Sequence, residues 1–248
     1  DDADQAFEEA YGRCVERADD PDATALMLAE RARIAALRQD YRRAAEMFAR
    51  AAATPGLAGA VQWRYRNEQA SVLVDLGREF GDSAALEQAI DLYENTLLGL
   101  APQAERPDDW AMTQHNLGNA LGVLGQRQRG TWMLERSIRA FETALSERRR
   151  ERVPQDWATT QNNLGNTLGI LAQRQNDTEM LERSVQAFDN ALEIRPRGQA
   201  PREWATTLNN LGAALLTLGQ RMKDPTILKK SVEAYKAVLQ EWTRERAP

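Results

Sequence analysis

The sequence repeats itself with a period of 47 residues, and this period constrains the fold more than any other feature. The segment PDDWAMT at residues 107–113 returns as PQDWATT at 154–160 and as PREWATT at 201–207. Each copy continues with a second similar block, which is LERSIRAFETAL at 134–145, LERSVQAFDNAL at 181–192 and LKKSVEAYKAVL at 228–239. The three copies align without gaps, so we expect a row of similar units that each contact their neighbours.

Each copy is predicted to form a pair of helices. The first helix of the middle copy, called helix A, carries one apolar stripe at the spacing of an α-helix. This stripe consists of Trp157, Leu164, Leu168 and Leu171. Pro154 suits the first turn of helix A, where its missing N–H is not needed. After a break at residues 176–177, a second helix, called helix B, is expected from about Thr178 to Ile194.

The repeat resembles the tetratricopeptide repeat, whose pattern joins a Leu–Gly pair on helix A to small and aromatic residues on helix B. The residues that carry the resemblance are Leu164, Gly165, Leu168, Ser184, Phe188, Ala191 and Pro196. These copies are 13 residues longer than the family's period of about 34, and the family's Trp position holds Gln161 here, so they are a stretched variant. Bacterial proteins with long DWA…NNLGN repeats are similar, and kinesin light chains are similar more loosely. The resemblance implies an all-α, right-handed superhelix of helical hairpins.

Weaker copies of the pattern extend toward the N-terminus. We expect a single solenoid over residues 1–248, with about eleven helices. Its parts are an orphan helix within 1–20, a standard-length repeat at 21–56, a divergent repeat at 57–106, and the three long repeats at 107–153, 154–200 and 201–247.

Composition agrees with this fold and excludes several functions. Hydrophobic residues make up 42% of the chain and aromatic residues only 6%, which favours helices over strands. The net charge of −5 argues against nucleic acid and against an anionic membrane surface as partners. Cys14 and His115 are the only cysteine and histidine, so neither a disulfide framework, a metal site nor a catalytic dyad is expected. We therefore expect no enzyme activity and no cofactor.

The ends of the sequence suggest a fragment. The chain starts at Asp1 without Met, as an internal fragment does, or a mature protein that has lost a signal peptide. Pro107, Pro154, Pro201 and Pro248 are each 47 residues apart, so the sequence stops on the first residue of another copy. We expect a piece of a longer array. A cytoplasmic location is favoured, while a secreted or periplasmic one stays open.

The face of helix A opposite the leucines carries polar side chains without charge. Residues 110–126, 157–173 and 204–220 contain no Asp, Glu, Lys or Arg, whereas an ordinary solvated face carries many. In the family that the repeat resembles, helix A lines the concave groove, and Asn there binds the backbone of an extended peptide. The candidate binding residues are Met112, His115, Asn119, Gln126, Thr159, Asn162, Asn166, Gln173, Thr206, Asn209 and Gln220.

A structural interpretation stands beside this one. Asn116, Asn163 and Asn210 lie on the flank of helix A, where we expect hydrogen bonds between neighbouring helices. The repeat glycines are expected to allow close packing of helices, and the repeat tryptophans to belong to the core. Side-chain specificity in the groove is expected from Tyr65, Met112 and Leu216.

The sequence therefore predicts a scaffold that recognises a protein or an extended peptide through helix A. One alternative is a regulatory segment of a larger signalling enzyme, because similar bacterial arrays are joined to caspase-like peptidases and nucleotide cyclases. Another alternative is an array that associates end to end with copies of itself.

Overall fold

The protein is described by a computed structural model over residues 20–246, and within that range the regular elements are helices. The helices form two compact units, Asp1–Val123 and Leu124–Pro248, which we call unit 1 and unit 2. The prediction of an all-α fold is confirmed. The expected orphan helix and Cys14 lie outside the described residues.

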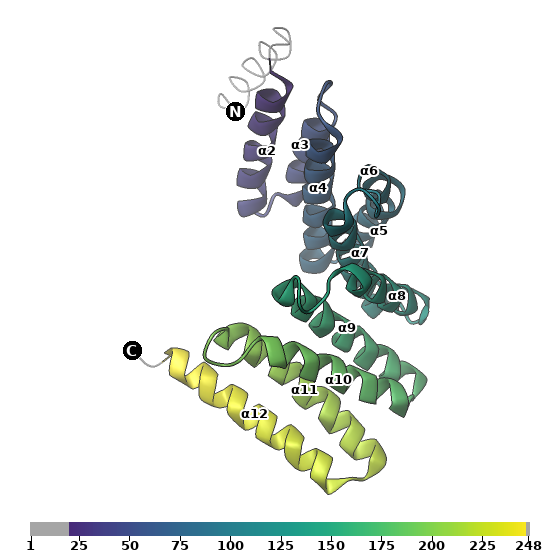
Figure 1. The fold of residues 1–248 in the computed structure, drawn as a ribbon, viewed down its shortest axis with the longest axis vertical. Helices are drawn as coiled ribbons and strands as arrows, with labels where there is room; N and C mark the ends of the chain where they lie inside the picture. Colours follow the sequence, from purple (N-terminus) through teal and green to yellow (C-terminus); the bar gives the residue numbers. More distant parts are fainter. Residues whose placement is uncertain (1–19, 247–248) are drawn as a thin grey trace. The chain divides into compact units, whose positions relative to one another are not determined.

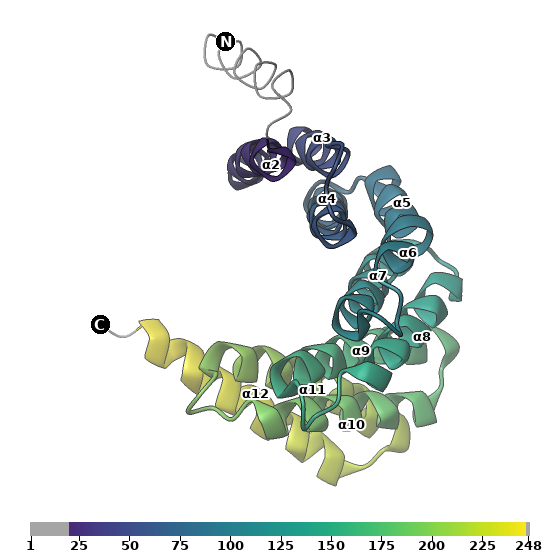
Figure 2. The ribbon, with the colours of Figure 1, turned by 45° about the horizontal axis from the view of Figure 1, so that its top comes forward.

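In unit 1, each helix from α2 (Pro21–Leu37) to α5 (Ser83–Leu92) packs on the next one along the chain. Figure 2 shows α2, α3 and α4 nearly end-on and side by side. The elements are α2 (Pro21–Leu37), α3 (Tyr41–Ala52), α4 (Gly59–Phe80), α5 (Ser83–Leu92), the π-helical segment η1 (Tyr93–Leu97), α6 (Leu98–Leu100) and α7 (Pro107–Arg127), whose last turn belongs to unit 2. The segment from α5 to α6 is one helix B with a π-helical turn inside it.

Unit 2 repeats the same arrangement of helical hairpins. Figure 1 shows α9 to α12 as successive layers, and neighbours along the chain pack against each other. The elements are α8 (Trp132–Glu147), α9 (Pro154–Gln175), α10 (Thr178–Ile194), α11 (Pro201–Met222) and α12 (Pro225–Arg246). Helix B of the middle copy thus has the bounds that its sequence predicts.

The helices begin and end where local chemistry requires it. Asp177 accepts a hydrogen bond from the N–H of Met180 at 3.0 Å, which caps α10. Asp40 and Asp82 cap α3 and α5 in the same way. Helix α9 ends at Asn176, whose φ of 57° is the left-handed conformation that stops a helix.

In the hairpins α9–α10 and α11–α12, helices A and B touch at a glycine. The Ser184 hydroxyl on α10 donates to the carbonyl oxygen of Gly165 on α9 at 2.6 Å. A Cβ atom at Gly165 would lie 3.0 Å from the Phe188 ring, and one at Gly212 would lie 3.2 Å from the Tyr235 ring. Ser231 donates to Gly212 at 2.7 Å, so both hairpins use one device. The expectation that the glycines allow close packing is confirmed.

Neighbouring hairpins share an apolar core. Phe141 on α8 packs with Leu164 and Leu168 on α9. One period later, Phe188 on α10 packs with Leu211 and Leu215 on α11. The repeat tryptophans are only half-buried, and an arginine stacks over two of them: the guanidinium carbon lies 5.7 Å from the Trp157 ring centre for Arg150 and 5.3 Å from the Trp204 ring centre for Arg197.

Substituting Gly77 tests the close contact between helices in unit 1. A Cβ at this position would lie 2.4 Å from Leu86 Cγ and 3.1 Å from the Asp82 carbonyl oxygen. We expect Gly77→Ala to lower the free energy of unfolding by about 1–3 kcal/mol through overpacking, despite the better helix propensity of Ala. Thermal and urea unfolding followed by circular dichroism measure this change.

The matched control is Gly99→Ala. Gly99 is also helical, and a Cβ there would meet no atom within 4 Å. This substitution should leave stability unchanged or raise it by up to about 1 kcal/mol. Equal melting temperatures for the two variants would contradict the packing argument.

Candidate functional site

The uncharged stripe of unit 2 lies on the surface of two neighbouring A helices, α9 and α11. On α9 the side chains of Asn166 and Gln173 are exposed, and those of Thr159 and Asn162 are half-buried. On α11 Thr206 and Gln220 are exposed and Asn209 is half-buried. Gln126, in the last turn of α7, is exposed as well. The candidate residues of unit 2 are therefore accessible to solvent in whole or in part.

The two A helices differ in chemistry at equivalent positions. Ala213 on α11 occupies the position of Asn166 on α9, and Leu216 occupies that of Gly169. Leu216 is exposed, as its predicted role in specificity requires. The stripe is thus rich in amides on α9 and partly apolar on α11.

Asn162 holds one hydrogen-bonding group that nothing in the described residues uses. Its amide nitrogen donates to the side-chain oxygen of Asn163 at 3.1 Å. Its own side-chain oxygen is buried and accepts no hydrogen bond there. Buried polar atoms are nearly always paired in folded proteins, so such an exception points to strain, to water or to a ligand.

A cation flanks one end of the stripe, which the sequence analysis missed. Arg195, just after α10, donates through Nη2 to the Thr159 hydroxyl and to the Gln155 carbonyl oxygen, the latter at 3.2 Å. Burial lowers the pKa of the Arg195 guanidinium, and its Nε is buried without a partner among the described residues. Arg148, one period earlier, donates to the Thr160 hydroxyl at 3.1 Å. The 47-residue spacing of these two arginines was the available signal.

A cavity of about 390 Å³ lies beside this arginine. It is lined by the end of α10, the first turn of α11 and Gln155 of α9. The stripe on α9 therefore starts next to a partly buried positive charge, although residues 157–173 of helix A carry no charge themselves.

The candidate residues of unit 1 are less accessible. Met112 and Asn119 on α7 are half-buried, and His115 is 7% exposed. Tyr65 on α4 is 1% exposed, so its ring does not offer a binding surface. Its hydroxyl accepts a hydrogen bond from Arg64, whose guanidinium stacks over the same ring.

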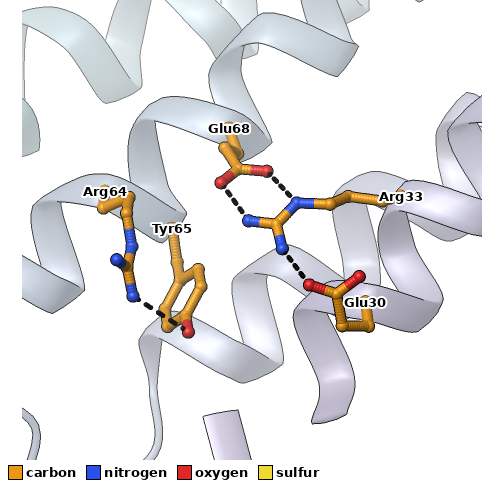
Figure 3. Close-up of polar contacts among 5 residues, drawn as sticks. All are labelled: Glu30, Arg33, Arg64, Tyr65 and Glu68. Atoms are coloured by element: carbon orange, nitrogen blue, oxygen red, sulfur yellow. Dashed lines mark hydrogen bonds and ion pairs between the residues drawn. The ribbon is translucent and has the colours of Figure 1, made fainter. Parts of the chain in front are cut away.

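On α4 the repeat position of His115 and Asn162 is used for contact between helices. This position holds Glu68, one period before His115. Arg33 on α2 binds Glu68 through two hydrogen bonds, Nε to Oε2 at 3.1 Å and Nη2 to Oε1 at 2.6 Å. Figure 3 shows this pair, together with the bond from Arg33 Nη1 to Glu30. The hydrogen bond to Glu68 is the main cause that raises the pKa of Arg33.

The flanking asparagine of unit 1 is structural, as predicted. The Asn116 amide on α7 donates to the Asn67 side-chain oxygen on α4 at 2.9 Å. Next to it, the Trp63 indole N–H donates to the Thr113 hydroxyl at 3.1 Å. These bonds join α4 and α7, the A helices of two consecutive hairpins.

Arginines at the ends of the A helices make a second kind of contact between hairpins. Arg174 on α9 donates to the carbonyl oxygens of Gly125, Gln126 and Gly130, each at 2.8 Å. Arg221, one period later, donates to the Ala172 carbonyl oxygen at 3.1 Å. Arg174 thus binds carbonyl groups at the end of α7 and in the loop after it, whereas the Ala172 carbonyl that Arg221 binds also accepts the backbone N–H of Asp177.

Within residues 20–246, we find no group of three or more His, Cys, Asp or Glu side chains that could hold a metal ion. None of the described helices combines the length and the apolar character that a bilayer-crossing segment needs.

Comparison with known proteins identifies the fold. No family model and no curated protein matches the chain. Among solved structures, BtubC (BKLC) from P. vanneervenii is similar with a TM-score of 0.62 and 20% identity, over 95% of this chain and 89% of that one. The putative kinesin light chain of Podosopora anserina, described as having nearly identical TPR-like repeats, has a TM-score of 0.62 and 16% identity, over 93% and 100%.

A third similar structure is MamA 41-end from Desulfovibrio magneticus RS-1. Its TM-score is 0.60 and its identity 15%, over 90% of this chain and 97% of that one. The chain therefore has the fold of tetratricopeptide-like repeat proteins.

Replacing Arg174 tests whether the helix-end contacts hold the hairpins together. Arg174→Lys keeps the charge but loses the planar fork that reaches three carbonyl oxygens. We expect the free energy of unfolding to fall by about 1–3 kcal/mol. Arg129→Lys, at an exposed position, is the control and should change it by less than about 0.5 kcal/mol. Chemical denaturation that ranks the two variants equally would rule this role out.

Proposed function

We propose that this chain is a non-enzymatic scaffold that holds a protein partner, as an extended segment, against the helix-A face of unit 2. The fold supports a role in protein interaction, since it offers an exposed helical surface and the stripe carries no nucleophile with a base beside it. The surface in question consists of the exposed and half-buried stripe residues on α9 and α11.

The side-chain oxygen of Asn162, which accepts no hydrogen bond within the described residues, carries the proposal. An extended peptide presents N–H and C=O groups along its backbone, and an Asn side chain supplies both a donor and an acceptor for them. The buried oxygen of Asn162 has no other partner among the described residues. Asn166 lies four residues further along α9 and is exposed, so two amides follow one face of the helix.

The lack of charge on the stripe supports an uncharged stretch of partner. A lysine or glutamate on the segment would lose hydration against residues 157–173 without gaining an ion pair from helix A. Exposed Leu216 on α11 adds an apolar contact at the edge of the amides. We therefore expect the bound stretch to combine backbone contacts with small or apolar side chains.

Peptide display tests the proposal without knowledge of the natural partner. Peptides selected on the wild-type protein should bind the double variant Asn162→Ala/Asn166→Ala more weakly. With one hydrogen bond lost for each amide, at roughly 1 kcal/mol per bond, the dissociation constant should rise roughly thirtyfold. Isothermal titration calorimetry measures the change, after circular dichroism has shown that helicity and melting are unaltered.

The matched control is Gln186→Ala/Asn190→Ala, which removes two amides from α10 instead. It should bind the selected peptides as the wild type does. Peptides with N-methylated backbone groups should lose affinity for the wild type if the amides capture the backbone. Full affinity of the α9 double variant would refute the helix-A site.

A further inference from the structure

The cavity beside Arg195 differs in charge from the stripe that it adjoins. It has a volume of about 390 Å³, and Arg195, Arg202 and Glu203 are its charged lining residues. Gln155 and Gln199, which are exposed, add amide groups to the lining. The stripe on α9 carries no charge of its own, so a segment bound there meets arginines at this end. The cavity is therefore a charged and polar site at the end of an uncharged surface.

Arg195 has hydrogen-bonding groups that the described residues leave unused. Its Nη2 donates to the Thr159 hydroxyl and to the Gln155 carbonyl oxygen. Its Nε is buried without a partner in the part of the chain that the structure describes, and its Nη1 makes no hydrogen bond there. The carboxylates of Glu203 and Asp156 favour its charge from a distance, but neither forms an ion pair with it. The half-buried guanidinium is thus partly withdrawn from water without a carboxylate in contact with it.

The equivalent arginine of the preceding hairpin is used differently. Arg148, one period before Arg195, is buried and donates forward to Thr160 on the next helix A. Arg195 is half-buried and donates back to Thr159, which belongs to the helix A of its own hairpin. Arg148 is therefore part of the contact between hairpins, whereas Arg195 lies at the edge of the stripe.

A carboxylate is the group that fits this guanidinium. Arginine is a permanent positive charge, and its hydrogen bonds to a carboxylate are charge-assisted and therefore stronger than neutral ones. Glu203 in the same lining disfavours a doubly charged phosphate more than a carboxylate, because repulsion grows with charge. Thr159 is a stripe residue and contacts Arg195 directly, so a carboxylate bound by Arg195 lies next to the start of the amide surface.

We propose that the segment bound on the α9 stripe carries an acidic side chain just beyond its uncharged stretch, and that Arg195 binds this carboxylate in the cavity through Nη1. This carboxylate site rests on the proposed function, since it assigns the chemistry of one end of the same segment. The asparagines of the stripe contact backbone groups, which every segment has. Arg195 selects segments by a side chain and fixes their register on the helix.

The spacing of the stripe residues sets the position of the acidic side chain. Asn162 and Asn166 lie three and seven residues after Thr159 on α9. Seven residues of helix correspond to about 10 Å along the axis, and about three extended residues span this distance. An acidic residue followed or preceded by a few uncharged residues is therefore long enough to contact Arg195 and both amides.

Small probes test the Arg195 site separately from the helix-A face. Acetyl-glutamate amide carries a side-chain carboxylate, acetyl-glutamine amide is its uncharged match, and acetyl-glutamine carries a terminal carboxylate only. In a titration of the whole chain followed by NMR, the Nε–H signal of Arg195 should shift with acetyl-glutamate amide and stay in place with acetyl-glutamine amide. The reference for unspecific binding is the signal of exposed Arg129, which precedes Gly130, a partner of Arg174 at the other end of α9.

Two results of this titration would overturn the carboxylate site. One is a shift of the Arg195 signal with acetyl-glutamate amide that is no larger than the shift of Arg129. The other is a shift with acetyl-glutamine alone, because the recognised carboxylate would then belong to a chain end. The variant Arg195→Lys lacks the Nε–H group and so identifies the signal.

Peptides selected on the wild-type protein test whether Arg195 acts on the segment that the stripe binds. Each acidic peptide is compared with a match in which Asp or Glu is replaced by its amide. The acidic peptide should bind the wild type roughly tenfold or more tightly than its match, because the match lacks the hydrogen bond between two charged groups. Arg195→Gln should abolish this ratio. A disturbance of Thr159 in the variant affects both peptides and cancels in the ratio of their affinities.

The control is Arg129→Gln, which makes the same change of net charge away from the cavity and should keep the ratio of the wild type. A selection without acidic peptides, a ratio of one on the wild type, or an unchanged ratio on Arg195→Gln would each refute the carboxylate site, while the dependence on Asn162 and Asn166 still decides the helix-A site. Full affinity of the Asn162→Ala/Asn166→Ala variant would refute the helix-A site itself, so the two failures are distinguished.

Discussion

The hairpins α9–α10 and α11–α12 depend on the close approach of their two helices at a glycine. At Gly165 and Gly212 the missing side chain leaves room for an aromatic ring of helix B, and the glycine carbonyl accepts the hydroxyl of Ser184 or Ser231. The serine is buried without cost because its polar group is paired. This one contact brings helix B near enough for its other face to pack against the next helix A, so the stack of hairpins depends on it.

Neighbouring hairpins are held together by apolar packing and by hydrogen bonds. The apolar side of α10 covers α11, while arginines such as Arg174 hold carbonyl oxygens at the end of the preceding helix A. The repeat position of Glu68 and Asn162 has different roles in the two units. On α4 it holds Glu68, which Arg33 binds, and on α9 it holds Asn162, which keeps an unused oxygen. At this position, the α4 side chain is therefore used for a contact between helices, whereas the α9 side chain keeps an oxygen without a partner in the described residues.

The period of the sequence predicted the helices of unit 2 closely, since the bounds of α10 follow from its Asp177 cap and its repeat of leucines. The accessibility of the polar stripe could not be predicted in the same way. A helical wheel places His115 of α7 and Asn162 of α9 at the same position of their helices. In the structure, however, His115 is 7% exposed and Asn162 is half-buried, because burial depends on the neighbouring helices. Arg195 reaches Thr159 from another helix, a contact that spacing along helix A does not contain.

The sequence by itself determined that the chain is helical, that its helices form hairpins, and that the faces of α9 and α11 carry no charge. These properties are local or periodic, so they follow from residue spacing and propensity. Only the tertiary structure decided which polar groups are paired and which lack a partner within the described residues. Pairing and burial depend on contacts between helices, which packing rather than sequence pattern brings about.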